Sequence, residues 1–189
     1  MKFKIGVFGS AENNKDEVVQ KARVLGDILG KQKVILITGA STGLPHEATE
    51  SAAKHGAEIW GYSPTTSLGK QKELFPQCDP AIYSKLFYIP KNYEFANDYG
   101  VCKKYRNVTS TANCDAGIII SGRWGSLNEF TNLYDMGKVI GVLTNTGGIA
   151  DELPMLYKKI AKQSQAKVFF NKSPMELVRL ILDELNNKH

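Results

Sequence analysis

Short, continuous apolar runs that alternate with helical segments constrain this fold more than any other feature of the sequence. Seven such runs occur, at residues 4–8, 34–37, 57–62, 86–89, 116–120, 139–143 and 168–170. Because a sheet with one solvated face alternates apolar and polar residues, continuous apolar strands indicate a parallel sheet covered on both faces. The sequence therefore predicts an α/β fold: a Rossmann-like, doubly wound, mostly parallel sheet with helices on both faces.

The segments between these runs have the apolar spacing of helices. Helices are predicted at residues 17–29, 45–55, 97–113, 126–136 and 173–187. One more is expected to start near residues 152–154 and to turn Leu156, Ile160 and Ala161 inward. The helix at 173–187 has the clearest start, with Ser173 as N-cap and a proline in its first turn.

Residues 63–84 differ from the rest of the chain. They contain Pro64, Pro76 and Pro80 and show no clear period. A loop of this length inside a compact domain is unusual and often functional, but a variable surface insertion explains it equally well. We expect one nucleotide-binding domain over residues 1–189, with 63–84 as a long loop or insertion and 173–187 as a C-terminal helix.

The composition is that of a soluble globular protein, with 42% hydrophobic and 23% charged residues. The net charge of +5 comes from scattered lysines, which favours solvated helix faces over nucleic-acid binding. Three cysteines without metal-ligand spacing indicate reduced thiols. No apolar stretch approaches the ~20 residues of a membrane span. We therefore expect a cytoplasmic protein that does not contact membranes.

Three glycine-bearing turns follow apolar runs, at Gly9-Ser10, residues 39–43 and residues 121–125. Ligands of doubly wound sheets bind beyond the carboxyl ends of the strands, so these turns could converge on one crevice. The third turn leads into a helix, whose unpaired N–H groups and positive dipole end attract phosphate. We expect a phosphorylated small molecule there. The candidate ligand-binding residues are Gly9, Ser10, Gly39, Gly43, Ser121, Gly122, Arg123, Trp124, Gly125 and Ser126.

Other nucleotide and metal signatures do not occur in the sequence. The first apolar run ends in G-S-A-E-N-N, and no Walker lysine follows a glycine loop. The sequence therefore does not predict NAD or ATP bound in those modes. His46 and His55 have no partners at metal-ligand spacing, and both are predicted on an exposed helix surface. The sequence predicts neither a metal nor a cofactor.

The block R-N-V-T-S-T-A-N-C-D-A-G-I-I-I-S-G-R-W-G-S-L-N-E, residues 106–129, resembles the signature of the LOG family. That signature has a central arginine, a Ser/Ala-Asp-Ala strand and then P-G-G-x-G-T-x-x-E. The resemblance also covers the Gly-Ser end of the first run and the T-G-x-x-x-G-L after the second, and it reaches about residue 145. LOG members of known activity are cytokinin-activating phosphoribohydrolases, which release a base from a nucleoside 5′-monophosphate.

The resemblance implies that Arg106 and Glu129 are catalytic. Cleavage of an N-glycosidic bond builds positive charge on the ribose, which a carboxylate could stabilise. An arginine could bind phosphate or hold the glutamate in place. The resemblance also implies a homodimer or higher homo-oligomer, built through the helices at residues 97–113 and 126–136.

The block departs from the LOG pattern in its turn and beside the arginine. Ser121 replaces a proline, Arg123 the second glycine, Ser126 a threonine, and Asn107 a common lysine. Arg-Asn followed by G-x-W-G-[ST]-L-x-E is more similar to the branch that contains molybdenum-cofactor carrier proteins. Those proteins bind a phosphorylated pterin without necessarily transforming it.

Two functional hypotheses stay open after this comparison. The first, slightly preferred, is a phosphoribohydrolase that uses Glu129 and Arg106 without a metal; the alternative is a non-catalytic carrier or sensor of a phosphorylated ligand. A DNA-processing role is weaker, because no basic or winged-helix segment is appended. Lysine decarboxylation has no lysine in a recognisable pyridoxal-phosphate setting. Trp124 is either a ligand-stacking ring or a lid on the core, and Arg123 is either a surface residue or a ligand contact.

Overall fold

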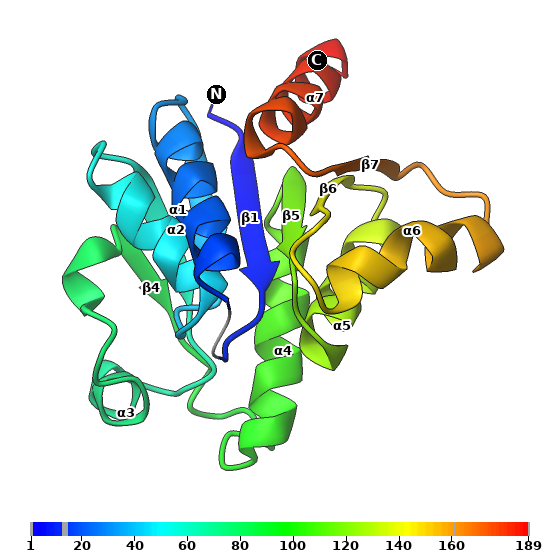
Figure 1. Ribbon diagram of the computed structural model, residues 1–189. Helices are drawn as coiled ribbons and strands as arrows, with labels where there is room; N and C mark the ends of the chain where they lie inside the picture. The colour runs from blue at the N-terminus through cyan, green and yellow to red at the C-terminus, as the bar shows by residue number, and fades with distance from the viewer. Residues whose placement is uncertain (1, 13–14, 161, 189) are drawn as a thin grey trace.

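A computed structural model describes residues 2–12, 15–160 and 162–188, and within them the chain forms a seven-stranded sheet (Figure 1). The strands are β1 (Lys4–Gly9), β2 (Ile35–Thr38), β3 (Glu58–Tyr62), β4 (Lys85–Phe87), β5 (Ala116–Ile120), β6 (Val139–Leu143) and β7 (Lys167–Asn171). Their order is β4-β3-β2-β1-β5-β6-β7, and every pair is parallel. The predicted Rossmann-like α/β architecture is confirmed.

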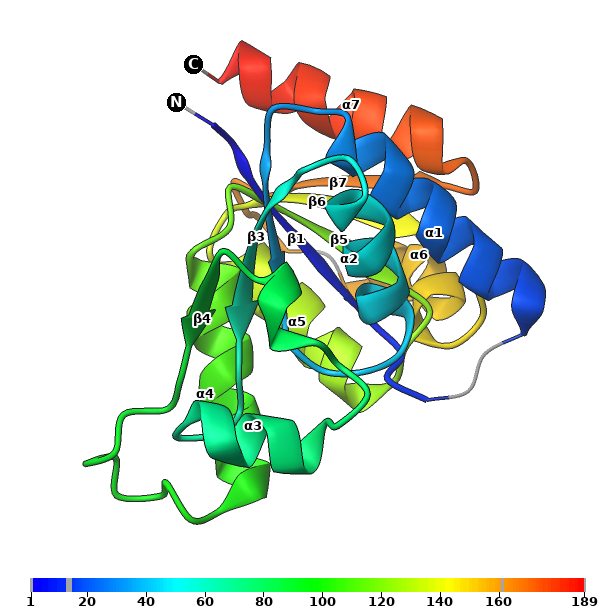
Figure 2. The same ribbon diagram turned by 90° about the vertical axis from the view of Figure 1, so that its left-hand side faces the viewer.

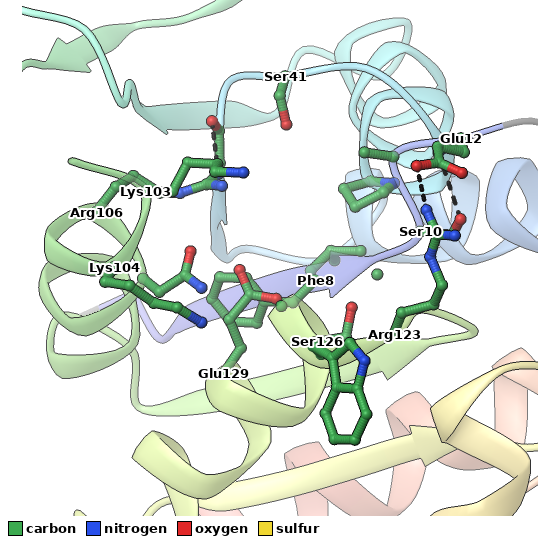
Figure 3. A pocket seen from close by; sticks show the side chains of 18 residues that line it. Phe8, Ser10, Glu12, Ser41, Lys103, Lys104, Arg106, Arg123, Ser126 and Glu129 are labelled. Atoms are coloured by element: carbon green, nitrogen blue, oxygen red, sulfur yellow. Dashed lines mark hydrogen bonds and ion pairs between the residues drawn. The ribbon is translucent and has the colours of Figure 1, made fainter. Parts of the chain in front are cut away.

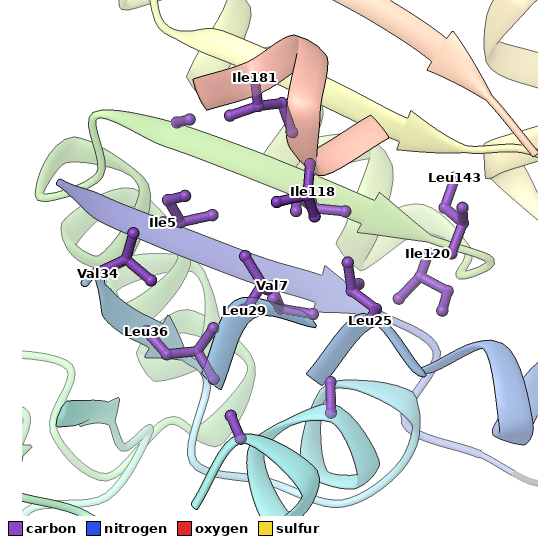
Figure 4. Close-up of a cluster of buried hydrophobic side chains, with 14 of the residues drawn as sticks. Ile5, Val7, Leu25, Leu29, Val34, Leu36, Ile118, Ile120, Leu143 and Ile181 are labelled. Atoms are coloured by element: carbon purple, nitrogen blue, oxygen red, sulfur yellow. The ribbon is translucent and has the colours of Figure 1, made fainter. Parts of the chain in front are cut away.

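Helices cover both faces of this sheet (Figure 2). They are α1 (Asp16–Gly30), α2 (Leu44–Ala53), α3 (Leu68–Leu74), α4 (Tyr99–Ala112), α5 (Trp124–Asp135), α6 (Ile149–Ile160) and α7 (Pro174–Asn187). On one face, α1 and α7 place Leu25, Leu29 and Ile181 against Val7 and Ile118 of the sheet (Figure 4). The opposite face is packed by α5 and α6, with α4 beside α5.

The chain reverses its direction of winding between β1 and β5. These two strands are neighbours, yet α1 follows β1 on one face and α5 follows β5 on the other. The two connections therefore diverge, which opens a crevice at the carboxyl ends of these strands.

Residues 63–84 are more ordered than the sequence predicts. They contain α3 and a 3₁₀ helix, Pro80–Ile82, and they bury Gln71 and Cys78. Each short helix has a side-chain cap, from Ser67 and Asp79 respectively. A helix of seven residues makes only about two turns, which is too short to show a period in the sequence.

The prediction for the helix after β6 was wrong in its start and in one residue expected to face inward. Helix α6 begins at Ile149, and Pro154 lies inside it. The earlier start follows from the preceding turn, where the Asp151 carboxylate accepts the N–H groups of Asn145 and Gly147. Ile160, predicted to turn inward, is 64% exposed. Ala161 lies outside the described residues.

Smaller corrections concern two helix boundaries and one histidine. Helix α5 starts at Trp124, two residues before the predicted Ser126, whereas α7 begins after its Ser173 cap as predicted. His46, predicted on an exposed surface, is buried, because α2 is packed around most of its circumference. Among the described residues, no helix has both the length and the apolar character that crossing a bilayer requires.

Candidate functional site

A pocket of about 360 Å³ lies at the carboxyl ends of β1 and β5, where the connections diverge (Figure 3). This volume falls in the range of small-molecule sites. Its walls are formed by the turns that follow β1, β2 and β5 and by helix α4. The lining residues are Val7, Phe8, Gly9, Ser10, Ala11, Glu12, Gly39, Ser41, Pro45, Lys103, Lys104, Arg106, Asn107, Arg123, Trp124, Gly125, Ser126 and Glu129.

Most of the residues singled out from the sequence meet in this pocket. Those that line it are Gly9, Ser10, Gly39, Arg106, Arg123, Trp124, Gly125, Ser126 and Glu129. Three candidates, Gly43, Ser121 and Gly122, do not line it and instead shape the turns behind it. The three glycine-bearing turns therefore converge, although not every residue in them faces the cavity.

The turn after β5 aims the start of α5 at the pocket. Ser121 and Gly122 have φ of 53° and 93°, which reverses the chain within two residues. A Cβ on Gly122 would lie 2.1 Å from the Ser126 hydroxyl oxygen, so a larger residue does not fit there. The Gly122 carbonyl accepts a hydrogen bond from Ile149 N at 2.7 Å, which fastens the turn to α6. The first N–H groups of α5, which have no partner within the helix, are thus held at the pocket wall.

Glu129 lies one helical turn beyond Ser126 and is only 6% exposed. Figure 3 shows its carboxylate directed into the pocket between Lys104 and Ser126. Burial raises the pKa of Glu129 to about 7, while the charges of Arg106 and Lys104 act in the opposite direction. Within the described part of the chain, no group donates a hydrogen bond to this carboxylate. It is therefore free to interact with a ligand and able to exchange a proton near neutral pH.

Arg106 projects from α4 on the opposite wall and is held by the backbone after β2. Its Nη1 donates a hydrogen bond to the Gly39 carbonyl at 2.8 Å. A Cβ on Gly39 would lie 1.5 Å from that same nitrogen, so only glycine leaves room for the guanidinium. The resemblance to LOG proteins pointed to Arg106, but nothing in the sequence pointed to its contact with Gly39.

Sequence reasoning missed three polar residues of α4 as site residues. Lys103, Lys104 and Asn107 line the pocket beside Arg106. Asn107 donates through Nδ2 to Asn128 at 3.1 Å, and its Oδ1 is buried with no partner among the described residues. The signal was present as K-K-Y-R-N, residues 103–107, but the lysines were interpreted as part of a scattered surface charge.

Arg123 and Trp124 lie at the mouth of the pocket. Arg123 forms an ion pair with Glu12, which joins the β5–α5 turn to the segment after β1. Trp124 is 83% exposed, which excludes a role as a lid on the core. Among the described lining residues, basic side chains outnumber carboxylates, so the pocket is complementary to an anion.

The sequence profile of the SLOG cluster4 family matches residues 2–178. The chain belongs to this family. No match is found among curated proteins. The family and the confirmed fold bear out the resemblance to LOG-type proteins, and Moco carrier proteins are among the solved structures that share this fold.

Three solved structures illustrate the range of similar proteins. TM1055 has a TM-score of 0.78 and 19% identity, over 97% of this chain and 99% of its own. The Moco carrier protein from Chlamydomonas reinhardtii has a TM-score of 0.71 and 18% identity, over the whole of both chains. DNA processing protein A from Helicobacter pylori, described by its single-stranded DNA binding mode, has a TM-score of 0.63 and 19% identity, over 96% and 81%. At these identities the likeness concerns the fold alone.

Proposed function

We propose that this SLOG cluster4 protein binds a nucleoside 5′-monophosphate and hydrolyses its N-glycosidic bond, releasing the free base and ribose 5-phosphate. The observation that carries the proposal is the buried Glu129 carboxylate, which faces the pocket without a hydrogen-bond donor from the described chain. In a site that only binds its ligand, such a carboxylate would accept hydrogen bonds from ligand N–H or O–H groups. In a site that must stabilise a developing cation, its negative charge acts directly on the reaction.

The phosphate is assigned to the start of α5. Backbone N–H groups there, the Ser126 hydroxyl and the positive end of the helix dipole all favour an anion. Arg123 at the mouth supplies a further positive charge. Because Glu129 follows one turn later on the same helix, a ligand anchored by its 5′-phosphate would bring its ribose toward the carboxylate.

The reaction needs no group beyond water and the residues of the pocket. The electron pair of the glycosidic bond leaves with the base, which takes up a proton, and the oxygen of water bonds to C1′. Ionised Glu129 stabilises the positive charge that builds on the ribose and can accept a proton from the attacking water. Arg106 favours the ionised form of Glu129 and therefore supports this role.

A second candidate is a carrier or sensor that holds a phosphorylated pterin or nucleotide without cleaving it. The specific observation in its favour is Arg123, which replaces a glycine of the LOG signature and pairs with Glu12 across the pocket mouth. The similarity in fold to a Moco carrier protein points the same way. Both candidates use the same anion-binding turn and differ only in what Glu129 does.

Release of free base distinguishes the two. Purified protein is incubated with AMP, GMP, IMP, CMP and UMP, and free base is quantified beside Glu129→Ala. Base release that this substitution abolishes supports hydrolysis. Tight binding of a phosphorylated ligand with no base release from any monophosphate contradicts it and favours the carrier.

A further inference from the structure

The segment at residues 63–84 carries a buried glutamine whose amide is tied at both ends. Gln71 of α3 is 1% exposed, and its Nε2 donates to the Ala40 carbonyl at 2.6 Å. Its Oε1 accepts a hydrogen bond from the Ser63 hydroxyl. The same hydroxyl accepts a hydrogen bond from the backbone N–H of Thr65 at 3.0 Å. Because a carbonyl oxygen can only accept, the NH₂ side of Gln71 must face Ala40. The amide is therefore oriented by its surroundings.

Ala40 adopts a backbone conformation that a residue with a side chain seldom takes. Its φ is 47°, in the left-handed region, where residues other than glycine are uncommon and strained. It directly follows Gly39, whose carbonyl accepts a hydrogen bond from the guanidinium of Arg106. Two successive carbonyls thus have separate side-chain partners: Gly39 is bonded by Arg106 and Ala40 by Gln71.

We propose that Gln71 is a positioning residue for Arg106: it holds the backbone of residues 39–40 so that the Gly39 carbonyl orients the guanidinium in the pocket. The segment 63–84 is then a brace for the α4 wall of the site. The inference rests on the proposed function, since Arg106 and Glu129 are its working residues. It adds a residue that never touches the ligand and acts through the backbone.

Glu129 reports on the position of Arg106. The charged groups around its carboxylate are Arg106 and Lys104 on α4, while Arg123 and Glu12 pair at the pocket mouth. Burial raises the pKa of the nearby Cys114 thiol, which is therefore neutral. Within the described chain, Arg106 is the one of these groups linked to Gln71, through hydrogen bonds to the successive carbonyls of Gly39 and Ala40. Moving Arg106 away removes a positive charge and lets the pKa of Glu129 rise further. Loss of packing around α3 by itself would not change that pKa.

The test combines a titration with kinetics. The side-chain carboxyl of Glu129 is followed by ¹³C NMR, and base release from AMP is measured on the same samples. Gln71→Met keeps the size of the side chain and removes the donor to Ala40. We expect its Glu129 titration to move upward by roughly half to one pH unit. We also expect kcat to fall by roughly ten- to a hundredfold.

Two reference variants frame this result. Gln77→Met changes an exposed glutamine of the same segment and should leave both the titration and kcat at the wild-type values. Arg106→Met should produce the larger shift, and adding Gln71→Met to it should change nothing more, because both substitutions act through one guanidinium.

The outcomes separate this inference from the proposed function. If Arg106→Met shifts the titration and folded Gln71→Met does not, Gln71 has no positioning role, whatever the enzyme does. If Gln71→Met does not fold, Ser63→Ala loosens only the Oε1 end of the amide and must show a smaller shift in the same direction; an unchanged titration overturns the inference. If Gln71→Met shifts the titration but wild-type protein releases no base, the positioning role stands and the proposed hydrolysis fails.

Discussion

The two walls of the pocket are built in different ways. The α5 wall consists mainly of backbone: a turn with left-handed residues and the first N–H groups of a helix. The α4 wall consists of side chains, above all Arg106, whose position depends on contacts with the backbone after β2. One wall therefore belongs to a local stretch of chain, and the other to contacts between residues far apart in sequence.

This difference decides how each wall should respond to mutation. A backbone wall tolerates the loss of a single side chain, because its N–H groups remain. A wall made of side chains loses its function when a mutation at a distant residue displaces the side chain that faces the ligand. Glu129 lies between the two walls and reports on both. The four predictions below test this contrast, from the largest expected effect to the smallest.

The largest effect is on stability and concerns the carboxylate between the walls. In the folded state the pKa of Glu129 is about 7, above its ordinary value of 4.5. The folded state therefore holds this proton more tightly, and stability is lost as the pH rises from about 4.5 through 7. Glu129→Gln should raise the free energy of unfolding at pH 8 by up to about 3 kcal/mol and change it little at pH 4.

Urea denaturation at the two pH values measures this effect. Glu94→Gln, at an exposed glutamate, serves as the matched control and should leave stability unchanged at both. Equal stability of wild type and Glu129→Gln at pH 8 would show that the carboxylate is well solvated and that the walls do not enclose it.

The second effect tests how strongly the α4 wall depends on the backbone after β2. A Cβ on Gly39 would lie 1.5 Å from Arg106 Nη1, so Gly39→Ala must push the guanidinium aside. We expect base release to fall by roughly ten- to a hundredfold in a protein that still folds. Gly69→Ala, in α3, where the new methyl group would meet only the Ser67 hydroxyl oxygen at an ordinary contact distance of 3.9 Å, should retain wild-type activity. If Gly39→Ala is equally active, Arg106 has no part in the chemistry.

The third effect is the pH dependence of the rate. If ionised Glu129 is the working form, base release should increase through about pH 7 and be about tenfold faster at pH 8 than at pH 6. Initial rates with saturating AMP between pH 5 and 9 measure this limb. A rate that falls over the same range would assign Glu129 the role of a proton donor instead.

The smallest effect concerns the α5 wall. Ser126→Ala removes one hydroxyl from the phosphate site but leaves the N–H groups of the helix start. We expect KM for AMP to rise by roughly three- to tenfold, with kcat nearly unchanged. A loss as large as that of Gly39→Ala would mean that this wall too depends on its side chains, and the contrast between the walls would disappear.

The contrast also explains what the sequence could predict. The sheet and the α5 wall follow from local patterns: continuous apolar runs, and glycines placed between a strand and a helix. Arg106 and Glu129 were identified through the spacing of a family signature, not through any visible contact between them.

Features that depend on contacts between distant segments escaped prediction. Gln71 lies in a short helix without a period, and its partner Ala40 is 31 positions away. The hydrogen bond from Ile149 N, at the start of α6, to the Gly122 carbonyl joins two turns that are distant in sequence. Residues such as these carry no local signal, because the interaction that defines them exists only once the sheet has brought the segments together.

The central claim is that Glu129 promotes hydrolysis of the N-glycosidic bond of a nucleotide that the rest of the pocket binds. The most direct test measures binding and base release in the same solution, for wild type and for Glu129→Gln, with each of the five nucleoside monophosphates. The account predicts that the wild type binds and releases base from at least one of them. Glu129→Gln should bind that nucleotide with similar affinity and release base at least about a hundredfold more slowly. Binding without base release by the wild type, or equal release by Glu129→Gln, would contradict it.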